Sequence, residues 1–369
     1  MTGPATAGWR APGKLFVAGE YAVLEPGRHA ILIAIDRWVE ATVSASGGAD
    51  VEIRSDLRPG VTRLRRGDGG LRAEDERTET GGLRHVMSAI EVLHALLEEQ
   101  GRRPTPIRVT VTSRLHREGA KLGLGSSGAV TVATVSAVAA YLGVELSPER
   151  RYRLAMLATA RLDPLASGGD LAASVWGGWI AYQAPDRAAV VDLARRRGIT
   201  EALRAPWPGF GARRLPPPRD LALEVGWTGE PASTAALSAR LASGPWWGSA
   251  AHRAFAATSD ECVGAAIGAL DHGDDDALLR RIRAAREVLA RLDDEVRLGI
   301  FTPRLNALCA AAESVGGAAK PSGAGGGDCG IALLNAAARG ELSRMRQDWY
   351  AAGLLPMPIH VSTTIGSTA

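Results

Sequence analysis

A run of small residues occupies the middle of this 369-residue chain. Residues 128–142 read GAVTVATVSAVAAYL, with alanine, serine and threonine between the valines. Small side chains let neighbouring elements approach closely, and the run is longer than an ordinary strand. It therefore predicts a buried helix, which other elements must cover on several sides.

The segments around this helix alternate between β-type and helical patterns. Short β-prone runs are separated by glycine, proline and aspartate, whereas elsewhere apolar residues recur at helical spacing. The pattern and the length predict an α+β protein of two domains, residues 1–210 and 211–369, linked by the Pro- and Gly-rich segment 207–218. We expect strands at 14–18, 29–35, 38–44, 107–113, 177–182 and 331–334, helices at 83–99, 148–160 (capped by Ser147), 235–241 and 277–292, and a surface excursion at 61–82.

Composition argues against several classes of protein. The net charge of +3, without clustered basic and aromatic residues, does not favour a nucleic-acid-binding protein. No stretch approaches the roughly 20 apolar residues that a membrane helix needs, and the first residues lack a secretory signal. The three cysteines and seven histidines show no zinc-ligand spacing. We expect a cytoplasmic protein without a protein-bound zinc ion.

Lysine is rare in this chain. Of 43 basic residues only three are lysines, Lys14, Lys121 and Lys320, and the others are arginines. A compact ammonium group enters tight anion pockets that the planar guanidinium cannot enter. Because all three lysines lie in or beside glycine-containing segments, we interpret them as anion-binding residues rather than as chance survivors.

The strongest local signal is KLGLGSSG, residues 121–128, directly before the small-residue helix. Glycines let backbone N–H groups approach a ligand, and a helix start adds unpaired donors and the positive end of the helix dipole. Such a loop predicts a phosphate site, although alone it also fits a tight turn into a buried helix. The candidate phosphate-binding residues are Gly123, Leu124, Gly125, Ser126, Ser127 and Gly128, with Ser127 also a candidate magnesium ligand.

Four other segments carry polar residues at glycine turns. In APGKLFVAGEYAVL (11–24), Glu20 and Tyr21 fit either the lining of a cleft or a hairpin cap with structural hydrogen bonds. In SGGDLAAS (167–174), Asp170 fits a site residue, a helix N-cap or both. GWTGEPAST (226–234) offers hydroxyls before a helix, but alone it is more typical of a capped helix start. The five glycines of KPSGAGGGDCG (320–330) indicate backbone packed against a ligand or against the other loops.

Taken together, PxxxxxxGEY, GLGSS and GAGGGD, in this order, resemble the three motifs of the GHMP kinases, a family of small-molecule kinases. Lys121 ahead of GLGSSG, the stretch SGGDLAAS–WGGWIAY and the GWTGEPAST loop resemble the branch that acts on (R)-5-phosphomevalonate. Two features depart from the family pattern. Gly128 stands where many relatives have alanine, and REGAK (117–121) replaces the usual PxxxG before the middle motif.

The resemblance implies a ribosomal-S5-like N-terminal domain and a ferredoxin-like C-terminal domain, with the site between them. It further implies use of ATP and Mg²⁺ to form (R)-5-diphosphomevalonate in the mevalonate pathway, by a monomer or homodimer without nucleic-acid or membrane partners. The resemblance places the ATP-phosphate loop at Gly123 to Gly128, and the catalytic residues that it implies are Lys14, Lys121 and Asp170. The substrate-binding candidates are Lys14, Glu20, Tyr21, Ser167, Ser233, Thr234, Ser322, Ala324 and Gly325.

Phosphoryl transfer between two anions requires positioning and neutralisation of charge. We therefore hypothesise that Lys14 and Lys121 stabilise the transition state and that Asp170 orients a reacting group. Alternatives remain open: a mevalonate kinase or another GHMP small-molecule kinase, a diphosphomevalonate decarboxylase, or a non-catalytic ATP-binding relative. The GWTGEPAST loop speaks against a mevalonate kinase, because that enzyme needs no second phosphate site, and the retained lysines and Asp170 speak against a silent binder.

Overall fold

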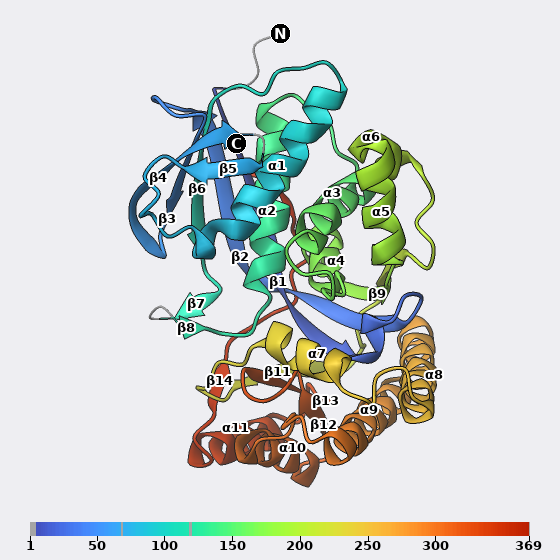
Figure 1. Ribbon diagram of the computed structural model, residues 1–369. Helices are drawn as coiled ribbons and strands as arrows, with labels where there is room; N and C mark the ends of the chain where they lie inside the picture. Colours follow the sequence, from blue (N-terminus) through green and yellow to red (C-terminus); the bar gives the residue numbers. More distant parts are fainter. Residues whose placement is uncertain (1–4, 68, 118–119, 369) are drawn as a thin grey trace.

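The computed structural model describes residues 5–67, 69–117 and 120–368. Within them the chain forms a nine-stranded sheet and a four-stranded sheet, with helices packed on each. The larger sheet lies in the upper part of Figure 1 and the smaller sheet in the lower part. The strands are β1 (Thr6–Ala18), β2 (His29–Ala45), β3 (Val51–Ser55), β4 (Arg58–Gly67), β5 (Gly70–Ala73), β6 (Ile107–Ser113), β7 (His116–Arg117), β8 (Ala120–Lys121), β9 (Trp179–Gln183), β10 (Gly211–Leu215), β11 (Leu221–Trp227), β12 (Ala318–Pro321), β13 (Cys329–Asn335), β14 (Leu355–Met357) and β15 (Gly366–Ser367). The helices are α1 (Arg84–Glu99), α2 (Ser126–Tyr141), α3 (Pro148–Ala160), α4 (Gly169–Trp176), α5 (Arg187–Arg197), α6 (Ile199–Arg204), α7 (Thr234–Ser243), α8 (Ala250–His272), α9 (Asp275–Val296), α10 (Pro303–Ser314) and α11 (Arg339–Ala351).

The long strand β2 organises the larger sheet. Strand β1 pairs antiparallel along one edge of β2, whereas β9 and β6 pair with the first and second halves of the other edge. The sheet continues from β6 through β3 and β4 to β5. The register of β1 against β2 shifts twice, between Pro12 and Lys14 and between Phe16 and Ala18. Such bulges bend a strand and re-aim its side chains, and here they do so at the candidate site.

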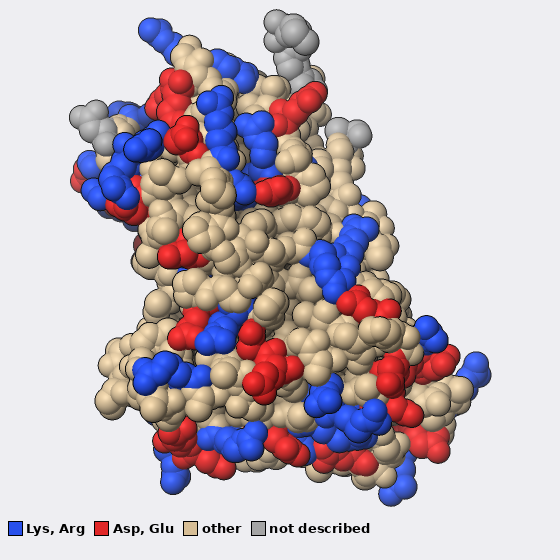
Figure 2. Space-filling model, turned by 90° about the vertical axis from the view of Figure 1, so that its right-hand side faces the viewer, with Lys and Arg blue, Asp and Glu red and all other residues tan. Residues whose placement is uncertain are grey.

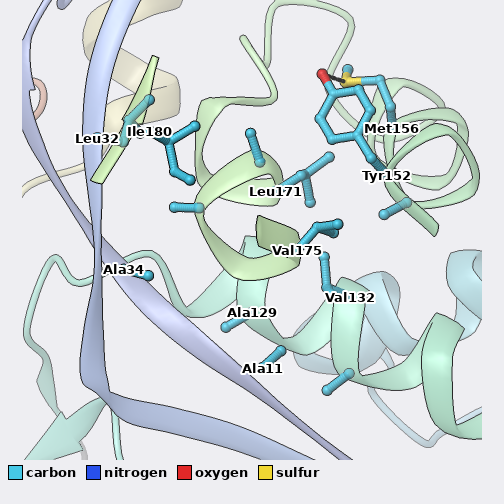
Figure 3. Packing of buried hydrophobic residues seen from close by; sticks show 14 of the residues in the cluster. Ala11, Leu32, Ala34, Ala129, Val132, Tyr152, Met156, Leu171, Val175 and Ile180 are labelled. Atoms are coloured by element: carbon cyan, nitrogen blue, oxygen red, sulfur yellow. Dashed lines mark hydrogen bonds between the residues drawn. The ribbon is translucent and has the colours of Figure 1, made fainter. Parts of the chain in front are cut away.

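Helix α2 is the buried helix that the small residues predict. It packs against β1 and β2 and is flanked by α1, α3 and α4. Its Ala129 and Val132 are fully buried. Figure 3 shows them with Leu171 and Val175 of α4, near Ala34 of β2. Because none of these side chains is large, two helices can approach the same part of the sheet closely. The N-termini of both helices are thereby placed beside β1.

The smaller sheet has the strand order β12-β13-β11-β14, with antiparallel pairs throughout. Helices α9, α10 and α11 pack on it, and α8 runs beside α9 and also contacts β2. Trp349 and Met345 of α11 are fully buried with Leu308 of α10 in its core. At the end of β11 the chain enters the loop that leads to α7, so this loop is carried by the central part of the smaller sheet.

The end of the chain returns to the larger sheet. Ser362 donates its backbone N–H to the Ala34 carbonyl oxygen at 2.8 Å, and the Asp36 N–H donates to the His360 carbonyl oxygen at 2.9 Å. Strand β15 then pairs with β1. Strand β10 also pairs with β9 in the larger sheet. We therefore propose that the first domain extends to Leu215, beyond the boundary predicted near residue 210, and that it also includes the last strand.

Three local expectations differ from the structure. Residues 61–82 are not simply a surface excursion, since β4 and β5 extend the sheet. The alternating pattern of β4 is weak in the sequence, because one of its two buried residues, Thr62, is polar and only Leu64 is strongly apolar. The two strands expected at 29–35 and 38–44 are one strand, β2. The expected link contains β10, whose outward Arg213 and Arg214 are typical of an edge strand. The other predicted strands and helices are confirmed, and Ser147 caps α3 by accepting from the Arg150 N–H.

In the described part of the chain, no helix is long and apolar enough to cross a membrane. Figure 2 shows one face of the molecule, with basic and acidic side chains interspersed at both ends and few charged side chains in the band between them. This face therefore shows no continuous basic stripe of the kind that binds a nucleic-acid backbone.

Candidate active site

Lys14 lies at the centre of the candidate site. The residue is 9% exposed and sits on β1 beside its first register shift. Its Nζ donates to the Gly123 carbonyl oxygen at 3.1 Å, and its backbone N–H donates to the Leu124 carbonyl oxygen at 2.8 Å. A Cβ at Gly125 would lie 2.6 Å from the Lys14 side chain, and one at Gly323 would lie 3.6 Å from Nζ. Lys14 therefore touches glycine loops from opposite halves of the chain.

The middle glycine loop leads into α2 in the way that phosphate binding requires. Gly123 and Gly125 have φ values of +73° and +79°, a left-handed conformation that favours glycine. Gly125 occupies the N-cap position of α2 and has no side chain to cap it. The first N–H groups of the helix, at Ser126 and Ser127, therefore lie free of a side-chain cap at the positive end of the dipole. Both serines are half-buried.

Asp170 faces the start of α2 from the neighbouring helix. It is the second residue of α4, whose N-cap is Gly168, so the alternative that Asp170 is an N-cap is wrong. Its Oδ1 accepts a hydrogen bond from the Leu171 N–H at 3.0 Å. A Cβ at Gly128 would lie 2.4 Å from its Oδ2. Burial raises the pKa of Asp170, and the nearby Lys14 ammonium opposes that rise. The carboxylate is thus within electrostatic reach of Lys14.

A pair of tyrosines fixes the turn that precedes Asp170. The Tyr182 hydroxyl donates to the Ser167 carbonyl oxygen at 2.5 Å and lies 2.7 Å from the Tyr152 hydroxyl. Both rings are buried. The Ser167 hydroxyl is half-buried and accepts weakly from the Gly169 N–H at 3.4 Å. The backbone of this turn is therefore held from beneath, while the Ser167 hydroxyl has capacity for a ligand.

Ser233 caps α7. Its hydroxyl accepts from the Ala236 N–H at 3.3 Å, and both Ser233 and Thr234 are exposed. The structure thus gives Ser233 the capping role, and the exposed hydroxyls and N–H groups of this first turn remain a second candidate anion site.

Glu20 and Tyr21 are engaged inside the protein. Glu20 forms an ion pair with Lys320, and the two residues are 3% and 0% exposed. The Gly323 N–H also donates to Glu20 Oε1 at 3.3 Å. The Tyr21 hydroxyl donates to the Ala324 carbonyl oxygen at 2.5 Å. These contacts match the structural alternative for both residues, since they tie the end of β1 to the late glycine loop. A role of either residue as a substrate ligand stays a prediction.

The same holds for Ser322 and for the third lysine. The Ser322 hydroxyl accepts from the Phe16 N–H at 2.8 Å and donates to the Phe16 carbonyl oxygen at 3.0 Å. It thereby satisfies the backbone N–H and carbonyl groups of Phe16, next to the second register shift of β1. Lys320 is fully buried against Glu20. Lys320 therefore departs from the expectation that all three lysines bind a ligand anion, because the anion next to it is the side chain of Glu20.

Lys121 is exposed at the end of β8, immediately before the middle loop. Its charge adds to burial in lowering the pKa of His85 to about 4, and it lowers the pKa of Asp328, which burial raises. Lys14 also lowers the pKa of Asp328, so both lysines are within electrostatic reach of this carboxylate. Residues 118 and 119, which precede it in the REGAK segment, lie outside the described residues.

Asp328 is a site residue that the sequence analysis did not name. It is 8% exposed, and with Tyr21 and Arg297 it is one of three non-glycine residues with positive φ in the described chain, at 54°. A Cβ at Gly123 would lie 2.3 Å from its Cγ. Its Oδ1 accepts from the Ala232 N–H at 3.0 Å. The signal available in the sequence was an acidic residue that directly follows three glycines.

The structure thus gathers the other four candidate segments around Lys14, which belongs to the fifth. The middle loop, the turn before Asp170 and the late glycine loop contact it or act on it, and Asp328 connects the loop before α7. The N-termini of α2 and α7, together with Lys14 and Lys121, therefore lie near the boundary between the two sheets. This combination provides several fixed positive groups for two polyanions.

Matches to family models cover both halves of the chain. Residues 84–178 match the GHMP kinases N terminal domain, and residues 266–351 match the GHMP kinases C terminal model. The chain is 60% identical over 365 residues to phosphomevalonate kinase from Streptomyces sp. (strain CL190), which covers 97% of this chain and 98% of the relative.

The chain belongs to the GHMP kinase family.

A more distant relative in the family is mevalonate kinase from Pyrococcus horikoshii, 30% identical over 376 residues, 95% of this chain and 94% of the relative. Among solved structures, the Lin0012 protein from Listeria innocua superposes with a TM-score of 0.89 at 30% identity, covering 98% of this chain and 99% of that chain. Streptococcus pneumoniae phosphomevalonate kinase in complex with phosphomevalonate and AMPPNP superposes with a TM-score of 0.83 at 26% identity, covering 96% and 99%. The α+β class and the two-domain GHMP kinase architecture are therefore confirmed.

Proposed function

We propose that this GHMP kinase transfers the γ-phosphate of ATP to (R)-5-phosphomevalonate and forms (R)-5-diphosphomevalonate. The observation that carries the proposal is the position of Lys14 between the glycine loop of α2 and the late glycine loop, with a second helix N-terminus nearby at α7. A kinase whose acceptor is itself a phosphate needs two anion sites, and these two helix starts supply them. The 60% identity to a phosphomevalonate kinase supports this choice of acceptor.

In this proposal the α2 loop, Gly123 to Gly128, binds the phosphates of ATP through backbone N–H groups. The first turn of α7, with Ser233 and Thr234, binds the phosphate of the acceptor. Lys14 and Lys121 neutralise charge that builds up between donor and acceptor, which is the main requirement of phosphoryl transfer. Because the second pKa of a phosphomonoester is about 6, the attacking oxygen is already ionised near neutral pH. Asp170 then has a positioning task rather than that of an obligatory base.

A magnesium ion fits this site mainly through the nucleotide. Mg²⁺ is commonly held by substrate phosphates and by few protein groups. In the described residues no group of three or more histidine, cysteine, aspartate or glutamate side chains could hold a metal. The half-buried Ser127 hydroxyl in the first turn of α2 is the protein group that we assign to the ion. The ion would neutralise phosphate charge when bound.

The test is an ADP-release assay with ATP and Mg²⁺, comparing phosphomevalonate, mevalonate, homoserine and galactose as acceptors. We expect turnover with phosphomevalonate and at least about a hundredfold lower kcat/KM with mevalonate, since mevalonate leaves the α7 site without its phosphate. A preference for mevalonate would assign the chain to the rival kinase, and turnover of none of the four would contradict the proposal.

Two variants test the roles within the site. We expect Lys121→Met to remove turnover, because the charge that builds up on the transferring group then loses one of its two lysine counter-ions. Asp170→Asn keeps the size of the side chain and its hydrogen bond from Leu171, so we expect measurable turnover to remain. The reverse pattern would refute this division of roles.

We also propose a cytoplasmic location. All three cysteines are buried free thiols, as is typical of proteins in a reducing compartment.

A further inference from the structure

Asp328 connects loops that belong to different parts of the site. Its backbone N–H donates to the Glu230 carbonyl oxygen at 2.7 Å, and its carbonyl oxygen accepts from the Thr228 N–H at 2.8 Å. Its Oδ1 accepts from the Ala232 N–H at 3.0 Å. Three hydrogen bonds thus fix residues 228–232, the loop that leads to Ser233 and the first turn of α7.

The other side of the same carboxylate lies against the ATP loop. A Cβ at Gly123 would be 2.6 Å from Oδ2 and 2.3 Å from Cγ of Asp328, so only a glycine leaves room for this contact. Gly123 is also the residue whose carbonyl oxygen accepts from Lys14 Nζ. One side chain therefore spans from the loop of the acceptor site to the loop of the donor site.

The backbone at Asp328 is strained for this purpose. A φ of 54° is left-handed, and outside glycine it is most readily adopted by asparagine and aspartate. The residue follows Gly327 in a segment rich in glycine, and a further glycine at this position would adopt the same positive φ without strain. Strained residues of this kind cluster at functional sites, where the surrounding contacts hold them.

We propose that Asp328 is a positioning residue that holds the acceptor-phosphate loop, residues 228–233, at a fixed distance from the ATP loop. This inference rests on the proposed function and assigns one further residue to it. The hydrogen bond to the Ala232 N–H is the decisive contact, because Ala232 directly precedes the α7 cap. The negative charge of the carboxylate is not required for it.

Two variants separate the hydrogen bond from the charge and from the backbone strain. Asp328→Asn keeps an acceptor oxygen and tolerates the left-handed conformation, whereas Asp328→Gly keeps the conformation and removes the acceptor. The matched control is Asp275→Ala. The carboxylate of Asp275 accepts from the Arg219 and Asp220 N–H groups, before the start of β11, at the opposite end of that strand from the 228–233 loop.

We expect Asp328→Gly to raise the KM for phosphomevalonate at least about tenfold, the effect of leaving the partly buried Ala232 N–H without its acceptor. Asp328→Asn and Asp275→Ala should stay within about threefold of the wild type. The inference is overturned if Asp328→Gly has a wild-type KM, if it loses only kcat in proportion to a loss of folded protein, or if Asp328→Asn is as impaired as Asp328→Gly.

Hydrogen–deuterium exchange of the substrate-free protein provides a readout that does not depend on turnover. Amides of residues 228–235 should exchange faster in Asp328→Gly than in the wild type or Asp328→Asn, while those of α9 remain unchanged. Unchanged exchange in this loop would overturn the inference. If instead the wild type does not turn over phosphomevalonate, the proposed function fails, and the exchange experiment still decides whether Asp328 holds the loop.

Discussion

Replacing Lys320 with methionine tests the claim that the buried ion pair with Glu20 holds the two halves of the protein together. Both residues are almost completely buried, and Lys320 Nζ also donates to the Pro321 carbonyl oxygen at 2.7 Å. Within the described chain, Glu20 Oε2 has no hydrogen-bond partner, and Oε1 would keep only the long bond from the Gly323 N–H. Methionine fills most of the lysine volume, so the change removes charge more than packing.

The expected cost follows from the charge that remains. Removing one partner of a buried pair costs about 3–5 kcal/mol, because the other charge is left without compensation in a medium of low dielectric constant. With an unfolding entropy of about 2.1 cal/mol/K per residue, a loss of about 4 kcal/mol lowers the melting temperature by about 5 °C if both domains unfold together. An exposed ion pair contributes at most about 1 kcal/mol.

The assay is urea unfolding followed by tryptophan fluorescence, with melting temperatures from calorimetry. The control Arg10→Met breaks the ion pair between Arg10 and Glu40, in which the Arg10 side chain is 51% exposed, and should cost less than about 1 kcal/mol. The double variant Glu20→Gln with Lys320→Met should recover most of the loss, since no charge then remains buried. If Lys320→Met costs no more than Arg10→Met, or if the double variant is as unstable as the single one, the reasoning fails.

Three further predictions follow from close contacts and from burial. Gly123→Ala should lower kcat/KM for ATP at least about tenfold, because its Cβ would meet the Asp328 carboxylate. The control is Gly143→Ala, at a residue with a similar φ of +68° and no atom within 4 Å of its Cβ. It should lower the free energy of unfolding by only about 1 kcal/mol and leave activity unchanged. Gly128→Ala should displace the Asp170 carboxylate, 2.4 Å from the new Cβ, and lower kcat while the melting temperature changes little; an unchanged kcat would show that Asp170 need not occupy this position. Burial lowers the pKa of His94 to about 3, so as the pH falls below about 6.5 the unfolded state takes up a proton that the folded state does not. Between neutral pH and pH 5 the wild type should therefore lose about 2 kcal/mol more unfolding free energy than His94→Gln. Parallel pH profiles of unfolding free energy for the two proteins would contradict this prediction.

The sequence was sufficient for the elements with a strong period and for the loops with a strong chemical signal. The small-residue helix, the capped helix at Ser147 and the glycine turn that leads into α2 could be predicted, because each depends on neighbours in the sequence. Strand β4 could not, since its buried face carries the polar Thr62 beside a single strongly apolar residue, Leu64, and so gives little hydrophobic alternation.

The partners of charged residues were the other limit. Nothing near Glu20 or Lys320 in the sequence shows that they meet, 300 residues apart, in the interior. The rarity of lysine correctly drew attention to Lys320, but it does not distinguish a lysine that binds a ligand from one that binds a buried glutamate. Asp328 escaped notice for a related reason, because its contacts at Gly123 and Ala232 arise only when three separate loops meet.

Strand β15 pairs with β1, the first strand of the chain, and the preceding residues bond to β2. During synthesis, the edge of β1 that β15 covers therefore stays bare until the residues of β15 have left the ribosome. The first domain cannot complete its sheet as the nascent chain emerges, although domains generally fold in order from the N-terminus. The sheet is completed only when β1 and β15 meet, and their pairing closes a loop that contains all the other strands and helices described above.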